Sequence, residues 1–189
     1  MRRRIFIAIN PPQDIKENLA LYQEKWPEFP VRWAKKGNLH ITLLFVGHIN
    51  DEELFEISKI VKQAADRHGS FPINLDKICY GPPGKMPPRM IWALGEKSKE
   101  FSELRNDLEK SLASCPQISI STEEKEFCPH ITLARIRKWE WQRVEPEERP
   151  QIEQDLDLHF SADSVEIMES ELKRGGAKYT VLESHNLGG

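Results

Sequence analysis

The tetrapeptide His-Ile-Thr-Leu occurs twice in this sequence, at residues 40–43 and again at residues 130–133, 90 positions later. Each copy lies in an apolar stretch typical of a β-strand, in which residues two apart share a face. Each strand therefore presents an imidazole and a hydroxyl on one side and buries two apolar side chains on the other. If the two halves of the chain are related by a pseudo-two-fold axis, two His–Thr pairs face each other across a cleft.

This set of side chains suits reactions at a phosphodiester. An imidazole titrates near pH ~6.5, so one histidine can be neutral and accept a proton while the other is protonated and donates one. Thr42 and Thr132 can donate hydrogen bonds to phosphate oxygens. Arg135 lies near the end of the second strand, and its guanidinium can stabilise the charge that spreads over those oxygens.

Cys128 is an alternative nucleophile, since it precedes His130 by two residues and shares its face. No third group that would orient a Cys–His pair is evident, so we interpret Cys128 as a structural thiol. The other four histidines have no comparable partner and are interpreted as surface or structural residues: His48, His68, His159 and His185.

The two motifs occupy the same place in two similar series of elements. Residues 4–9 predict a strand that is followed by a helix beginning near Pro12, and residues 89–94 predict a strand followed by a helix through Phe101 and Leu112. The remaining predicted elements are strands at 31–33, 39–46, 72–80, 118–120, 127–136, within 156–170 and at 179–183, and a helix capped by Asp51 and ended by Gly69. The order indicates a tandem duplication, with halves at about 1–84 and 85–189 in one domain.

The composition of the chain excludes several classes of protein. The chain has 189 residues, 39% of them hydrophobic, and a formal charge of −3, which fits one globular domain and excludes a general polyanion-coating protein. No run approaches the ~18 apolar residues of a membrane helix. Three cysteines without C-x-x-C spacing argue against a disulfide framework or a zinc site. We therefore expect a cytoplasmic protein without a membrane partner, and a monomer.

The sequence resembles the two-histidine phosphoesterases, and among them the RNA 2′,3′-cyclic phosphodiesterases, historically called 2′-5′ RNA ligases. The resemblance is carried by the two His-x-Thr motifs, by Arg32-Trp33, by Phe45 and Gly47 after the first motif, and by residues 127–135. It implies an α+β bilobal duplicated fold, with two antiparallel sheets facing a central cleft and helices outside. It also implies His40 as proton donor, His130 as proton acceptor, phosphate contacts from Thr42, Thr132 and Arg135, and no metal or cofactor.

The function expected is hydrolysis of the 2′,3′-cyclic phosphate at an RNA 3′ end, or of a cyclic nucleotide, to a 2′-phosphomonoester. Two alternatives remain open at this point: 2′-5′ RNA ligation on the same site, and a non-catalytic module that binds RNA ends or nucleotides. Phe6, Trp33 and Phe45 are candidates for stacking on a base. Basic residues flank both motifs and predict a small positive mouth: Arg32, Lys35, Lys36, Arg137 and Lys138.

Overall fold

The computed structural model describes residues 2–27, 29–120, 127–174 and 176–188. Its strands are β1 (Arg3–Ile9), β2 (Val31–Trp33), β3 (Ile41–Ile49), β4 (Phe71–Gly81), β5 (Met90–Gly95), β6 (His130–Ile136), β7 (Glu153–Ala162), β8 (Ser164–Lys173) and β9 (Gly176–Asn186). Its α-helices are α1 (Gln13–Leu21), α2 (Asp51–Arg67), α3 (Lys99–Ala113) and the short α4 (Lys138–Trp141). None of the helices described is both long and apolar enough to span a membrane.

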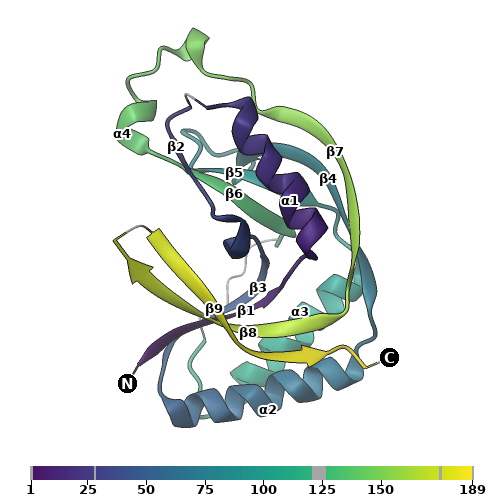
Figure 1. Cartoon of the computed structure of the whole chain (residues 1–189). Helices are drawn as coiled ribbons and strands as arrows, with labels where there is room; N and C mark the ends of the chain where they lie inside the picture. The colour runs from purple at the N-terminus through teal and green to yellow at the C-terminus, as the bar shows by residue number, and fades with distance from the viewer. Residues whose placement is uncertain (1, 28, 121–126, 175, 189) are drawn as a thin grey trace.

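The strands form one strongly curled antiparallel sheet (Figure 1). Along the described chain its order is β7-β4-β5-β6-β3-β1-β8-β9, with β2 paired to β6. The two sheets that we expected are the two halves of this order, and they meet at a single residue pair between β3 and β6, Ile41 opposite Ile131. The α+β class with antiparallel strands is confirmed, and the lobes share a continuous backbone ladder.

Each half of the sheet combines strands from both proposed halves of the chain. β1 and β3 are extended by β8 and β9, whereas β5 and β6 are extended by β4 and β7. The helices cross over as well: α1 follows β1 but packs near β7, and α3 follows β5 but packs against α2 and β3 (Figure 1). The proposed halves are therefore interlocked, and neither lobe is built from one half alone.

Alternation along the strands separates the hydrophobic core from the concave face. Ile5, Ile7 and Ile9 of β1 belong to the main core, whereas Phe6 and Ala8 form a small separate cluster with Met168. This second cluster lies on the side of the sheet that carries His40, because Phe6 contacts the His40 ring. The His40 side chain thus packs on a small apolar cluster that is separate from the main core.

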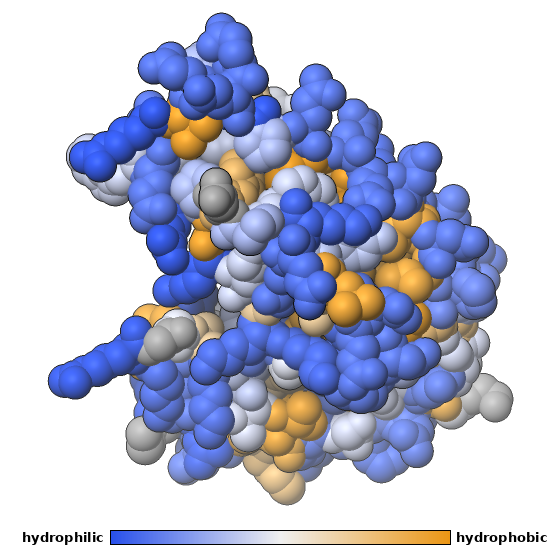
Figure 2. All heavy atoms as spheres, turned by 45° about the horizontal axis from the view of Figure 1, so that its top comes forward, coloured by the Kyte–Doolittle hydropathy of each residue, from blue (hydrophilic) through white to orange (hydrophobic). Residues whose placement is uncertain are grey.

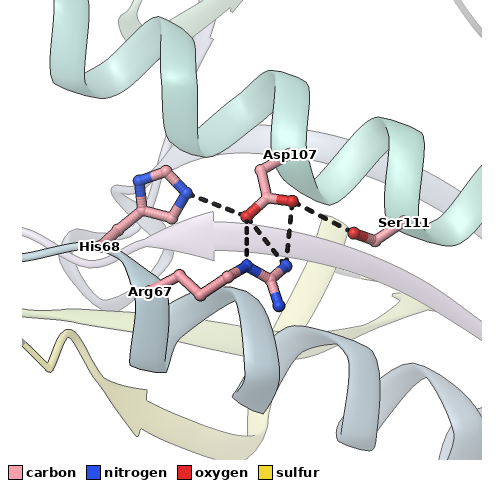
Figure 3. Close-up of polar contacts among 4 residues, drawn as sticks. All are labelled: Arg67, His68, Asp107 and Ser111. Atoms are coloured by element: carbon pink, nitrogen blue, oxygen red, sulfur yellow. Dashed lines mark hydrogen bonds and ion pairs between the residues drawn. The ribbon is translucent and has the colours of Figure 1, made fainter.

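Polar contacts join α2 to α3 on the outside of the fold (Figure 3). The Arg67 guanidinium donates to both carboxylate oxygens of Asp107, and His68 Nε2 lies 3.0 Å from Asp107 Oδ2. Ser111 donates a further hydrogen bond to the same carboxylate. His68 is thus a structural residue of the helical layer and takes no part in the arrangement of the two His-x-Thr motifs.

Three element predictions need correction. The cap of α2 is Asn50 and not Asp51, because Asn50 and Glu53 exchange two hydrogen bonds in a capping box. Residues 118–120 form no strand in the described structure: Ile118 is buried as a single side chain after a turn, which produces alternation without pairing. The stretch 156–170 spans two strands, since the chain passes at Asp163 from β7, which pairs with β4, into β8, which pairs with β1 and β9.

Candidate active site

The pairing of β3 with β6 brings the two motifs together. Ile41 and Ile131 are paired antiparallel and are both fully buried, so the residues on either side of them point to the opposite, concave face. This register places His40 across from Thr132, and Thr42 across from His130. A local two-fold axis passes between the two isoleucines and relates one motif to the other.

A β-bulge in each of these strands determines which later residue shares that face. The register between β5 and β6 shifts after Thr132, so Trp92 pairs with Thr132 while Met90 pairs with Arg135. Without the bulge, a residue five positions after His130 would point into the core. Met90 Sδ lies 4.0 Å from Thr132 Oγ1 and 3.7 Å from Arg135 Nη1, which puts all three side chains on one face.

The first motif has an equivalent bulge, because the register between β1 and β3 shifts between Thr42 and Leu44. Phe45 is thereby paired with Phe6 on the concave face. Phe45 lies 90 residues before Arg135 and occupies the position related to it by the pseudo-two-fold axis. The site is therefore asymmetric, with a guanidinium on one side and an exposed aromatic ring on the other.

Both imidazoles are oriented by a backbone carbonyl two residues earlier. His40 Nδ1 lies 2.6 Å from the Asn38 carbonyl oxygen, and His130 Nδ1 lies 2.7 Å from that of Cys128. A carbonyl only accepts hydrogen bonds, so Nδ1 is the donor in each ring and Nε2 is left for proton transfer. His40 Nε2 is 3.1 Å from Thr42 Oγ1. Sequence reasoning missed these carbonyls, because it considered Cys128 only for its thiol.

Aromatic rings pack behind the two imidazoles. His130 stacks on Trp92 with 3.7 Å between ring centroids and an angle of 20°. A β-carbon at Gly81 would lie 2.3 Å from Trp92, so this glycine leaves the space that the indole occupies. His40 contacts Phe6 at 4.9 Å and Tyr179 at 5.0 Å. The rings restrict the imidazoles to one orientation each.

The three candidates for base stacking differ in exposure. Phe6 is 3% exposed and offers no free face to a base in this structure, since it packs beneath His40. Trp33 is half-buried and parallel to Trp26, with 6.4 Å between the centroids. Phe45 is 60% exposed and lies 6.3 Å from Phe6. Phe45 is therefore the candidate with an open ring, and Phe6 lies between it and His40.

Lys16 of α1 is a further cation near the site. Its side chain is half-buried, and Nζ donates a 3.1 Å hydrogen bond to Asn10 Oδ1. Because Ile9 pairs with Ile41, Asn10 is the next residue along β1 and lies beside His40. The Asn10 backbone N–H in turn donates to Glu166, a buried carboxylate on β8. Only this long-range packing turns Lys16 toward the motifs.

Burial favours the neutral form of both histidines in the free protein. Burial lowers the pKa of His40 to about 4; the Asn38 carbonyl opposes this shift, and the positive charges of Lys16, His130 and Arg135 add to it. Burial also lowers the pKa of His130, against the effect of the Cys128 carbonyl. An anion bound between the two rings would restore their protonated forms.

The other four histidines take no part in this arrangement. His48 and His159 are exposed, His68 binds Asp107, and His185 lies 3.3 Å from Glu183. Among the described residues, no three or more His, Cys, Asp or Glu side chains are grouped so that they could hold a metal ion.

Two imidazoles that keep Nε2 for proton transfer, flanked by hydroxyls and a guanidinium, form a site for acid–base chemistry around a phosphate. The comparisons agree with this class. The family model described as LigT-like phosphoesterase matches residues 9–92. The RNA 2′,3′-cyclic phosphodiesterase of Thermotoga maritima is 31% identical over 95% of this chain and 92% of that protein. The enzyme of the same name from Methanocaldococcus jannaschii is 28% identical, covering 95% and 98% respectively.

A crystal structure of a Thermus thermophilus protein superposes with a TM-score of 0.82 at 30% identity, covering 98% of each chain. The chain belongs to the LigT-like phosphoesterases, as the resemblance in its motifs predicted, and it is a hydrolase of phosphodiester bonds.

Proposed function

We propose that this protein opens the 2′,3′-cyclic phosphate at an RNA 3′ end by water, leaving a 2′-phosphomonoester, with His130 as base and His40 as acid. The observation that carries the proposal is the register at Ile41 and Ile131, which sets two oriented imidazoles on either side of one point. The names of the Thermotoga and Methanocaldococcus relatives support the substrate.

Atoms and protons balance in a single displacement. His130 Nε2 accepts a proton from water, and the water oxygen forms a bond to phosphorus. The bond from phosphorus to O3′ breaks, and protonated His40 donates its proton to O3′. The entering and leaving oxygens of such a displacement lie roughly in line on opposite sides of phosphorus. Two rings related by a two-fold axis suit this requirement, because each can serve one of the two oxygens.

The remaining side chains stabilise the phosphate. Thr42 and Thr132 lie across from the opposite histidine and can donate to the non-bridging oxygens. Arg135 adds a charged donor on the Thr132 side. In this mechanism the protein's own acid, base and cation perform every step, so we propose that the reaction needs no metal. Ligation is the same chemistry with a ribose hydroxyl in place of water.

The direct test is incubation of the purified protein with a 2′,3′-cyclic nucleotide in EDTA, with the product identified by chromatography against 2′- and 3′-monophosphate standards. We expect complete conversion to the 2′-monophosphate, at a rate that the chelator does not change. Binding without turnover would establish the binding-module alternative. Loss of turnover with chelator would overturn the metal-free mechanism, and a 3′-monophosphate product would overturn the roles of acid and base.

The pH dependence of kcat/KM should be bell-shaped, with its maximum on the acid side of pH ~6.5. Burial lowers the pKa of both rings in the free enzyme, and that of His40 to about 4, so the alkaline limb, where the acid loses its proton, moves to lower pH. In the profile of kcat this limb should lie at higher pH, since the bound phosphate favours protonated rings. Initial rates between about pH 3 and pH 9 measure both profiles on either side of these values. A flat profile, or a kcat limb below that of kcat/KM, would contradict histidine acid–base catalysis.

A further inference from the structure

Two arginines lie directly opposite each other at the edge of the site. Arg32 in β2 pairs with Arg135 in β6, and antiparallel partners project to the same face. Both side chains are exposed, and neither forms an ion pair with any residue in the described part of the chain. Like charges in directly opposed positions destabilise a sheet. A bound anion beside the two arginines would offset this repulsion, so the pair indicates a site for anions.

The two guanidinium groups have different surroundings. That of Arg135 contacts Met90 Sδ, which also contacts Thr132, so it is directed inward to the His-x-Thr motif. That of Arg32 reaches across to the beginning of β9, where its Cζ and Nη1 lie 3.8 Å from the position of a β-carbon on Gly176. Gly176 has a φ of +110°, a conformation that side-chain-bearing residues rarely adopt. The Arg32 guanidinium therefore lies beside the start of β9, apart from the Arg135 guanidinium.

The Arg32 guanidinium lies at the opening of the concave face. The Asn38 side chain donates a 2.8 Å hydrogen bond to the Ala177 carbonyl, which joins the segment before β3 to the start of β9. In Figure 1 the β8–β9 hairpin projects on the same side of the molecule as β2, and Figure 2 shows an indentation on that side bordered mostly by hydrophilic residues. Exposed cations also occur along this hairpin, at Lys173, Arg174 and Lys178.

We propose that Arg32 binds the phosphodiester on the 5′ side of the terminal nucleotide while Arg135 binds the cyclic phosphate. The preferred substrate is then a polynucleotide end with two successive phosphates, and not a cyclic mononucleotide. This proposal rests on the proposed function, because it assigns the second phosphate relative to the one being opened.

The test compares a 2′,3′-cyclic mononucleotide with a dinucleotide that has the same terminal base and one internal phosphodiester. The wild-type enzyme should have the higher kcat/KM for the dinucleotide. The variant R32Q should lower the ratio of the two kcat/KM values by about tenfold or more, as expected for the loss of a charge-assisted hydrogen bond. R32K should recover part of that ratio. K110Q is the matched control, since it removes one exposed charge from α3 on the helical side and should leave the ratio as it is.

A second measurement changes the substrate. Replacing the internal phosphodiester by a neutral methylphosphonate should lower the wild-type kcat/KM for the dinucleotide to about the value for the mononucleotide. R32Q should be insensitive to the replacement, because the contact is already lost. Equal losses on both substrates would assign Arg32 to the cyclic phosphate and overturn the proposal, as would an unchanged ratio. Failure of the wild-type enzyme to hydrolyse either substrate would instead contradict the proposed function.

Discussion

Alanine at His40 or at His130 is expected to lower kcat for a 2′,3′-cyclic nucleotide by about 100-fold or more, the usual contribution of a general acid or base. In the proposed mechanism each ring acts through Nε2, because its Nδ1 is already used by a backbone carbonyl. The side chain that contacts His40 Nε2 is the Thr42 hydroxyl, which cannot replace an imidazole as acid or base near neutral pH. Steady-state kinetics of the two variants measures the effect.

The double variant should lose less than the product of the two single losses, since the acid and the base act in one step. H159A is the matched control, because His159 is an exposed histidine on β7 outside the site. Thermal melting of all four proteins shows whether the fold is retained. If either single variant kept near-wild-type turnover while folded, the assignment of the pair would be wrong.

Replacing Arg135 by alanine should lower kcat/KM by ~10²-fold or more, as is typical for loss of one donor to a developing oxyanion. Lysine at this position keeps the charge but not the two-pronged geometry, so R135K should fall between wild type and R135A. The bulge after Thr132 makes this position sensitive, because it directs Arg135 toward the phosphate, as the bulge in β3 directs Phe45 to the same face on the other side.

K110Q serves again as the control for a general change in charge. A kinetically silent R135A would place the phosphate contact elsewhere, and the cation to test next would be Lys16, which lies beside His40 through Asn10. The rank order of wild type, R135K and R135A separates a requirement for geometry from a requirement for charge.

The candidate catalytic pair, its chemistry and the order of elements follow from local features of the chain. The two-residue spacing of His and Thr on apolar strands is enough to place them on one face. The repetition of the motif after 90 residues in a matching strand–helix series indicates the pseudo-symmetry. The placement on one face depends only on residues within one strand of each other, where backbone geometry is nearly the same in every protein.

Other features depend on contacts between distant segments. Alternation alone would have turned Arg135 into the core, and the bulge that prevents this is a property of pairing with β5. The same is true of Asn50, Lys16, the orienting carbonyls and the Phe6 ring, whose roles come from hydrogen bonds and packing. Residue type and spacing therefore indicated which chemistry this protein performs. The register between β3 and β6, and the exchange of helices and strands between lobes, were set by the free energy of burying one shared core, which no local pattern records.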